Sequence, residues 1–223
     1  KSAPDHDKPF EGKSMVMIFE KPSTRTRISF DIAVKQLGGS SIFLNPEGIH
    51  YGKGDETLKD TAKVLSEYAD IIMLRTSSHK NLEEFGKYLN IPIINGLSDQ
   101  SHPCQVLTDL FSFEEAKGSI SGKSVAWLGD GNNNMSNSLI EAAGKFDFKL
   151  KIGCPNKYKP NKKIMTWAKK NKANVLVTDN PAEAVKDVDC VMTDKWVSMN
   201  DKVNKKAKKK SLKKYQVNKK LMN

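Results

Sequence analysis

Short, almost wholly apolar runs alternate along the chain with longer segments of mixed polar and apolar residues. The short runs are typical of buried parallel strands, which are apolar on both faces, and the longer segments are typical of helices. In the first half, strands are predicted over Ser14–Phe19, Ser40–Leu44, Asp70–Arg75 and Ile91–Gly96. In the second half, strands are predicted over Ser124–Asp130, Lys149–Pro155, Asn174–Asp179 and Val188–Asp194.

The helix after the first strand has clear predicted ends. Ser23 follows Pro22 and suits an N-cap, an apolar pattern that includes Ile28 and Ile32 follows it, and Gly38-Gly39 is a natural stop. The segments "DETLKDTAKVLSEYA" and "QVLTDLFSFEEAK" repeat the helical pattern. The alternation predicts an α/β fold of parallel sheets flanked by helices, and no short internal repeat is evident beyond it.

A small, polar, glycine-containing stretch, "AKGSISGKS", separates the two series of strands and is typical of a domain joint. We therefore expect two Rossmann-like domains, residues 1–117 and 118–223, each with its own sheet.

Composition narrows the class of protein. With 38% hydrophobic and 28% charged residues, the 223-residue chain is expected to fold as a globular protein. It has no run near the roughly 20 apolar residues of a membrane span, and its start has no signal-peptide pattern. Cys104, Cys154 and Cys190 lie far apart without metal-ligand spacing, which predicts reduced thiols in a cytoplasmic protein without a metal.

The net charge of +11 is concentrated near the end of the chain, where residues 195–220 hold eleven lysines and one acidic residue, Asp201. Such a run usually forms a solvated face, and it lacks the interleaved aromatic residues of a single-strand binder. An anion-binding or nucleic-acid-binding role of Lys202–Lys220 is kept as the alternative, and nucleic acid is not the partner we expect.

The stretch "FEKPSTRTRISFD" lies where a ligand is expected, because open parallel sheets bind ligands just past the carboxyl ends of their strands. Ser23, Thr24 and Thr26 surround a predicted helix N-terminus, which attracts anions, and Arg25 adds a guanidinium that matches phosphate oxygens. The stretch therefore predicts a phosphate site. On local grounds an ordinary serine cap with solvated arginines remains equally open.

Two further polar groups follow strand ends at the same predicted edge. Arg75 ends the third strand, and His102 and Gln105 come where the fourth strand gives way to a helix. We expect these residues to meet Arg25 and Thr26. A lone histidine in a loop is more often structural, but this one lies opposite two arginines.

These motifs carry a family resemblance that covers essentially the whole chain. "STRTR" followed by "HPCQ" resembles the carbamoyltransferases, and "GDGNNNMSNS" with "DKWVSM" resembles the acceptor motifs of the ornithine carbamoyltransferase family. The arginine-rich acceptor loop expected of an aspartate enzyme is absent. The resemblance implies a homotrimer that needs no metal or other cofactor and acts in arginine biosynthesis or, in reverse, in arginine breakdown.

The resemblance also implies residue roles in binding carbamoyl phosphate by the first domain. Ser23, Thr24, Arg25 and Thr26 would bind the phosphate, and Arg75, His102 and Gln105 would complete the site. Thr26, Arg75 and His102 would face the carbonyl oxygen, where preorganised donors stabilise the charge of the transition state. Gln105 would face the carbamoyl amide.

The second domain would bind ornithine. The resemblance assigns the α-carboxylate and α-amino groups to Asn134, or to Asn133, and to Ser198, with Met199 beside it, and an amine to Asp194. "GDGNNN" alone also fits a plain strand-to-helix turn or a dinucleotide loop, although it lacks the full GxGxxG pattern. Putrescine is the alternative acceptor, but it would leave Asn134 without a carboxylate to bind.

Some features depart from the family. The chain stops at Asn223, before the HCLP motif that helps to bind the acceptor, and it begins close to the first strand, so it resembles an enzyme truncated at both ends. An enzyme without the HCLP segment is expected to be incomplete, and the chain alone could be inactive as a carbamoyltransferase. Asn200 replaces the glycine that usually follows Ser-Met. His50 and Lys53 lie nearest to a family glutamine that reaches a neighbouring subunit, and neither is assigned a role.

Overall fold

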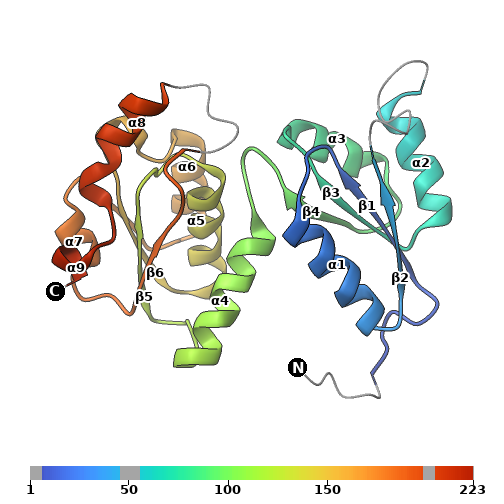
Figure 1. Ribbon diagram of the computed structural model, residues 1–223, viewed down its shortest axis with the longest axis horizontal. Coiled ribbons are helices and arrows are strands. Elements are labelled where there is room, and N and C mark those ends of the chain that lie inside the picture. The colour runs from blue at the N-terminus through green and yellow to red at the C-terminus, as the bar shows by residue number, and fades with distance from the viewer. Residues whose placement is uncertain (1–6, 46–55, 198–203, 223) are drawn as a thin grey trace. The chain divides into compact units, whose positions relative to one another are not determined.

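The computed structural model describes residues 7–45, 56–197 and 204–222. The chain forms two compact units, Lys1–Asp99 (unit 1) and Gln100–Asn223 (unit 2). Each unit has its own four-stranded sheet, and every strand pair is parallel (Figure 1). The predicted α/β fold with two parallel sheets is confirmed.

The elements follow the predicted alternation of strands and helices. Unit 1 contains β1 (Ser14–Phe19), α1 (Thr24–Gln36), β2 (Ser40–Leu44), α2 (Leu58–Tyr68), β3 (Ile71–Arg75), α3 (His79–Tyr88) and β4 (Ile93–Leu97). Unit 2 contains α4 (Pro103–Lys117), β5 (Ser124–Leu128), α5 (Asn134–Phe146), β6 (Lys149–Gly153), α6 (Lys162–Lys170), β7 (Val175–Thr178), α7 (Pro181–Val185), β8 (Cys190–Thr193), α8 (Lys205–Leu212) and α9 (Lys219–Met222), with short 3-10 turns η1 (Asn156–Tyr158) and η2 (Lys213–Tyr215). All eight predicted strands are present, and their ends lie within two residues of the predicted ones.

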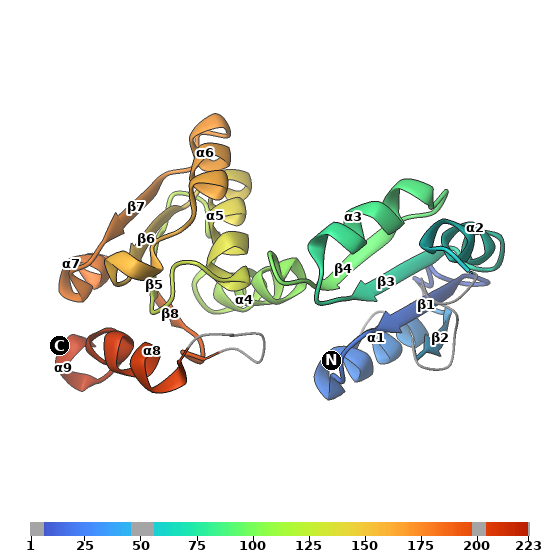
Figure 2. The ribbon, with the colours of Figure 1, turned by 90° about the horizontal axis from the view of Figure 1, so that it is seen from above.

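Each sheet has helices on both faces (Figure 2). The strand order is β2-β1-β3-β4 in unit 1 and β7-β6-β5-β8 in unit 2. In unit 1, Val16 and Ile18 of β1 pack under α2 and α3, whereas Met15 and Met17 face α1, as the two-residue period of a strand requires. Continuous apolar strands are therefore buried on both sides.

Helix α1 packs less deeply than its sequence pattern predicts. Val34 is its one buried residue, and Ile28 and Ile32 are about half exposed. The helix meets the sheet through Val34 and the partly buried Phe30, and Arg25 in its first turn is exposed.

Helix α4 packs with unit 2. Its buried residues Val106 and Leu110 join the cluster around Trp127, Leu139 and Ile140. The packing units thus divide near residue 100, whereas the boundary expected from the sequence lies at residues 117 and 118. That boundary concerns the family's two domains and stays a prediction.

The two sheets start their central strands with the same device. Gly-Lys-Ser precedes or opens β1 at residues 12–14 and β5 at residues 122–124, and both glycines have positive φ values, 69° and 75°. In each unit the serine N–H donates at 2.8 Å to an aspartate that immediately precedes the neighbouring strand, Asp70 for β1 and Asp189 for β5. This internal repeat was not predicted from the sequence, because in each unit the aspartate lies more than fifty residues after the Gly-Lys-Ser segment.

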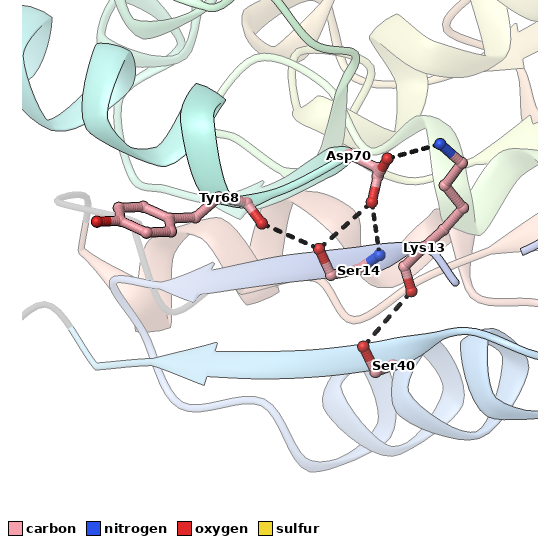
Figure 3. A network of polar contacts seen from close by, with 5 residues as sticks. All are labelled: Lys13, Ser14, Ser40, Tyr68 and Asp70. Carbon is pink, nitrogen blue, oxygen red and sulfur yellow. Dashed lines mark hydrogen bonds and ion pairs between the residues drawn. The ribbon is translucent and has the colours of Figure 1, made fainter. Parts of the chain in front are cut away.

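Figure 3 shows the unit 1 version of this device. Asp70 accepts hydrogen bonds from the Ser14 N–H and from Lys13 Nζ, both at 2.8 Å, and Ser14 Oγ donates to the Tyr68 carbonyl at 3.2 Å. Ser40 Oγ donates to the Lys13 carbonyl at 3.4 Å, so β2 is tied to the same point. Asp70 thereby ties the start of β3 to the start of β1, and Ser40 ties the start of β2 to the residue before β1.

No helix within the described ranges combines the length and the apolar character needed to cross a bilayer.

The hydrogen bond from Lys13, reinforced by the Ser14 N–H, lowers the pKa of Asp70. A lowered pKa means that this carboxylate stabilises the fold above its unfolded value, about 3.9, and that the contribution is lost as the pH falls through the folded value. We therefore expect Asp70→Asn to destabilise the protein at pH 7, with a difference from wild type that shrinks below about pH 4.

Urea unfolding across this pH range measures the difference, and Asp7→Asn, at an exposed site, controls for the loss of one carboxylate. A difference between wild type and Asp70→Asn that stays constant down to acid pH would contradict the prediction.

Candidate active site

The loop after β1 leads into the N-terminus of α1. Ser23 is the N-cap residue, as predicted, but its side chain makes no capping hydrogen bond, and the first turn of α1 contains no acidic residue. Neither a capping side chain nor an acidic residue of α1 therefore offsets the positive end of the helix dipole at these N–H groups. Such a terminus suits an anion.

The two arginines of STRTR have different surroundings. The guanidinium of Arg27 stacks 3.8 Å above the ring centroid of Phe43, on β2. Arg25 is exposed, and the described part of the chain gives it no ion pair. The sequence predicted Arg25 as the phosphate ligand, and its side chain is the one of the pair that is not engaged with an aromatic ring.

Arg75 lies at the end of β3 beside the same loop. Its Nη1 donates to Thr26 Oγ1 at 3.2 Å, so the structure brings these two predicted site residues together. Its Nε is buried and finds no hydrogen-bond acceptor among the described residues. Burial lowers the pKa of Arg75, because a charged group loses water there. A partly buried guanidinium with an unused donor favours an anionic ligand.

A carboxylate joins the segments that directly follow β1 and β3. Glu20, just after β1, accepts from Thr76 Oγ1 at 2.6 Å and from the Ser77 N–H at 3.1 Å. Its own N–H donates to the Arg75 carbonyl at 2.9 Å, and Thr76 is buried. This brace was not predicted from the sequence. A carboxylate and a hydroxyl immediately after two neighbouring parallel strands were the available signal.

His102 and Gln105 belong to unit 2, where His102 is the N-cap residue of α4 and Pro103 opens the helix. The His102 N–H donates to Ser138 Oγ at 2.8 Å, and Asn137 Nδ2 donates to the Gln100 carbonyl at 2.9 Å. Helix α5 therefore holds the segment that carries His102. Arg25 belongs to unit 1, and the expected meeting of His102 and Gln105 with Arg25 stays a prediction.

Gln105 takes part in a polar cluster within unit 2. Its Nε2 donates to Asp109 Oδ1 at 2.8 Å, one turn along α4. Burial raises the pKa of Asp109, the hydrogen bond from Gln105 opposes that rise, and the negative charge of Asp194 adds to it. Asp194 directly follows β8, so the predicted carbamoyl-amide ligand and the predicted amine ligand share one electrostatic neighbourhood.

The "GDGNNN" turn links β5 to α5. Gly129 has a φ of 135°, a conformation that side chains disfavour, and Asn133 is the N-cap residue of α5. Asn133 Oδ1 accepts from the Ser136 N–H at 2.9 Å, and the Asn133 N–H donates to Ser136 Oγ at 3.1 Å. This capping box fixes the carboxamide of Asn133 with its oxygen toward the helix, while Asn134 is the first helical residue.

Some residues singled out from the sequence lie outside the described ranges. They are Ser198 and Met199 of the predicted acceptor site, together with His50, Lys53 and Asn200. Within the described ranges, no three His, Cys, Asp or Glu side chains come close enough together to hold a metal ion.

Two family models match the chain. The carbamoyl-phosphate-binding domain of aspartate/ornithine carbamoyltransferase matches residues 1–115, and the aspartate/ornithine-binding domain of the same family matches residues 121–223. Together they account for nearly the whole sequence, in the order in which the motifs occur.

Individual relatives agree with these matches. An ornithine carbamoyltransferase of Rhodopseudomonas palustris is 48% identical over 222 residues, which is all of this chain and 71% of the relative. Solved ornithine carbamoyltransferases from Pyrococcus furiosus and Campylobacter jejuni give TM-scores of 0.88 and 0.89 at 42% and 38% identity. The chain aligns over 96% and 98% of its length with 69% and 73% of these two structures.

The anchor between α5 and the His102 segment leads to a stability prediction. Ser138→Ala removes the acceptor of the part-buried His102 N–H, and an unsatisfied N–H costs at most about 1–3 kcal/mol, the range for full burial. We expect urea unfolding to show a loss of that size. Ser211→Ala is the control, because its hydroxyl donates to the Ala207 carbonyl within its own helix. Equal effects of the two substitutions would contradict the anchoring role of Ser138.

Proposed function

The chain belongs to the aspartate/ornithine carbamoyltransferase family, and we propose that unit 1 binds carbamoyl phosphate at its strand ends while the turn at residues 129–134 binds ornithine. The protein is an enzyme of the transferase class, and its reaction is ornithine carbamoyl transfer. The ornithine side-chain amine forms a bond to the carbamoyl carbon, the bond from that carbon to the phosphate oxygen breaks, and the amine loses a proton. The products are citrulline and phosphate.

The carbamoyl phosphate site rests chiefly on one observation. Arg75 reaches Thr26 at the N-terminus of α1, and its buried Nε has no acceptor in the described part of the chain. The uncapped first turn, with Ser23, Thr24 and the exposed Arg25, supplies the remaining donors for the phosphate. An anion here meets a helix terminus and two guanidinium groups, whose charge also stabilises the departing phosphate.

The carbonyl oxygen gains negative charge as the amine attacks. We assign Thr26, Arg75 and His102 to that oxygen, since preorganised donors at such a position are each worth about 2.7–4 kcal/mol in acyl transfer. Asp109 accepts from the Nε2 of Gln105, which leaves the Oε1 of Gln105 as the acceptor for the carbamoyl amide. The family resemblance implies all four roles, and the contacts of Arg75 with Thr26 and of Gln105 with Asp109 fit them.

On the acceptor side, the capping geometry favours Asn133 over Asn134 as the ligand of the ornithine carboxylate. The oxygen of Asn133 is occupied by the helix cap, so its Nδ2 is a donor of fixed orientation, and a carboxylate accepts from such a donor. Asp194 would bind an amine of ornithine, and Ser198 with Met199 would complete the site, as the resemblance implies.

The setting of the reaction is also a proposal. We propose a cytoplasmic homotrimer that acts in arginine biosynthesis or, in reverse, in arginine breakdown. Within the described part of the chain no disulfide joins Cys104, Cys154 and Cys190, which fits a reducing compartment. The similar Campylobacter jejuni protein of known structure is named an anabolic ornithine carbamoyltransferase, which fits the biosynthetic direction.

Arg25 and Arg27 form a matched pair for testing the phosphate site. Arg25→Ala should weaken carbamoyl phosphate binding by about 10- to 150-fold, which corresponds to about 1.5–3 kcal/mol for hydrogen bonds to a charged group. Arg27→Ala removes a guanidinium two residues away that stacks on Phe43 and should leave the affinity nearly unchanged. Titration calorimetry measures both. If the two variants bind equally well, the assignment of Arg25 is wrong.

Asn133→Asp separates the role of this residue in binding from its role as a cap. Aspartate caps a helix as well as asparagine, but it replaces the Nδ2 donor by a negative oxygen that repels the ornithine carboxylate. We expect the ratio of kcat/KM for ornithine over putrescine to fall by about 10-fold or more, because putrescine lacks that carboxylate.

Asn134→Asp is the companion variant in the same assay of citrulline and carbamoylputrescine formation. If the ratio of kcat/KM for ornithine over putrescine falls in Asn134→Asp alone, Asn134 and not Asn133 binds the ornithine carboxylate. An unchanged ratio in both variants would remove the turn from the acceptor site.

A further inference from the structure

One lysine of the basic run is not on the surface. Lys208 of α8 is 3% exposed, while the lysines on either side of it along the helix are exposed. It shares the inward face of this segment with Leu212 and Tyr215, which are fully buried beside Leu128 and Tyr158. The basic run therefore packs on unit 2 through one defined face, and Lys208 is the charged residue of that face.

The partner of Lys208 lies in the turn assigned to ornithine. Lys208 Nζ is 2.5 Å from Asp130 Oδ2, and the two side chains are 4% and 7% exposed. The ammonium group also lies 5.4 Å from the ring centroid of Tyr158. Figure 2 shows α8 on the opposite face of the unit 2 sheet from α5. The ion pair thus reaches from one face of the sheet to the turn that leads into the helix on the other.

The other atoms of Asp130 shape that turn. Its Oδ1 accepts from the Asn132 N–H at 2.8 Å, and its carbonyl accepts from Trp127 Nε1 at 2.9 Å. At Gly131 a Cβ atom would lie only 2.8 Å from the Tyr158 carbonyl and 2.9 Å from Cys154 Sγ, so the turn has no room to shift toward them. One carboxylate oxygen holds the turn, and the other holds Lys208.

A buried ion pair needs a reason beyond stability. Removing two charges from water costs several kcal/mol per ion, and well-packed apolar residues often stabilise such a position as well or better. A helix with many lysines and few apolar residues could place a lysine outward at little cost. Burial of Lys208 against Asp130 selects the face of α8 that packs on unit 2. It also orients the Asp130 carboxylate, which accepts from the Asn132 N–H.

We propose that Lys208 is a positioning residue for the acceptor site, holding Asp130 so that the turn at residues 130–134 presents its asparagines to ornithine. The proposal rests on the assignment of ornithine to this turn. It gives the buried member of the basic run a specific role in the reaction, distinct from any contact with substrate.

Four variants test the proposal. Lys208→Met keeps most of the length of the side chain and removes its charge, and Lys208→Arg keeps the charge. Lys209→Met, at the exposed neighbour, is the matched control. The pair Asp130→Asn with Lys208→Met removes the ion pair without leaving a lone buried charge and keeps an acceptor for the Asn132 N–H, so it carries the test if Lys208→Met fails to fold.

Two readouts decide between positioning and simple support of the fold. In Lys208→Met, the KM for ornithine should rise by about 10-fold or more, since a small misplacement of a binding group is costly. The KM for carbamoyl phosphate should stay within about 2-fold, because that site lies on other residues. Hydrogen exchange at the Asn132 amide should become about 10-fold faster, independently of turnover. Lys208→Arg should restore each value, and Lys209→Met should change none.

Unchanged exchange at Asn132, or equal rises in the two KM values, would overturn the proposal. Failure of the proposed acceptor site has a different signature. In that case Asn133→Asp and Asn134→Asp leave the use of ornithine unchanged, while the exchange at Asn132 still reports whether Lys208 holds the turn.

Discussion

A parallel sheet depends on how the amino ends of its strands are fixed, because every ligand-binding loop leaves from the opposite end. Asp70 and Asp189 perform this task in the two units by accepting the N–H of the serine that opens the neighbouring central strand. Register errors at that point would carry through each strand to the loops beyond it. Arg75 lies beside Thr26 at the carboxyl ends of β1 and β3. Its placement therefore depends on the contact of Asp70 with Ser14 at the amino ends of the same two strands.

Features with a local signal were predictable from the sequence. The near-continuous apolar runs predicted all eight strands, and Ser23 with Gly38-Gly39 predicted the ends of α1. The motifs "STRTR" and "HPCQ" predicted the family because their residue types and order are specific. The apolar pattern was less reliable for burial: Ile28 and Ile32 have helical spacing but stay half exposed, since α1 meets the sheet mainly through Val34.

Contacts between distant segments had no such signal. The brace from Glu20 to Thr76 and the anchor from His102 to Ser138 each join segments more than thirty residues apart, and each uses common residue types. The basic run was expected as a solvated face, and for most of its lysines that expectation fits. Lys208 differs because Asp130, 78 positions earlier, is folded against it. The available local signal was the helical spacing of Lys208 to Leu212 and Tyr215, four and seven residues later, which places it on their face but names no partner for its charge.

Burial of Lys208 gives the lysines of this region unequal chemical reactivity. Reagents and enzymes that modify amines need an accessible, uncharged nitrogen, and the Nζ of Lys208 is enclosed and paired with a carboxylate. Acylation of the surface would strip most of the positive charge from α8 while leaving the ion pair intact. The positive charge of the exposed lysines of α8 can thus be removed while the contact of Lys208 with Asp130, and the turn at residues 130–134, stay in place.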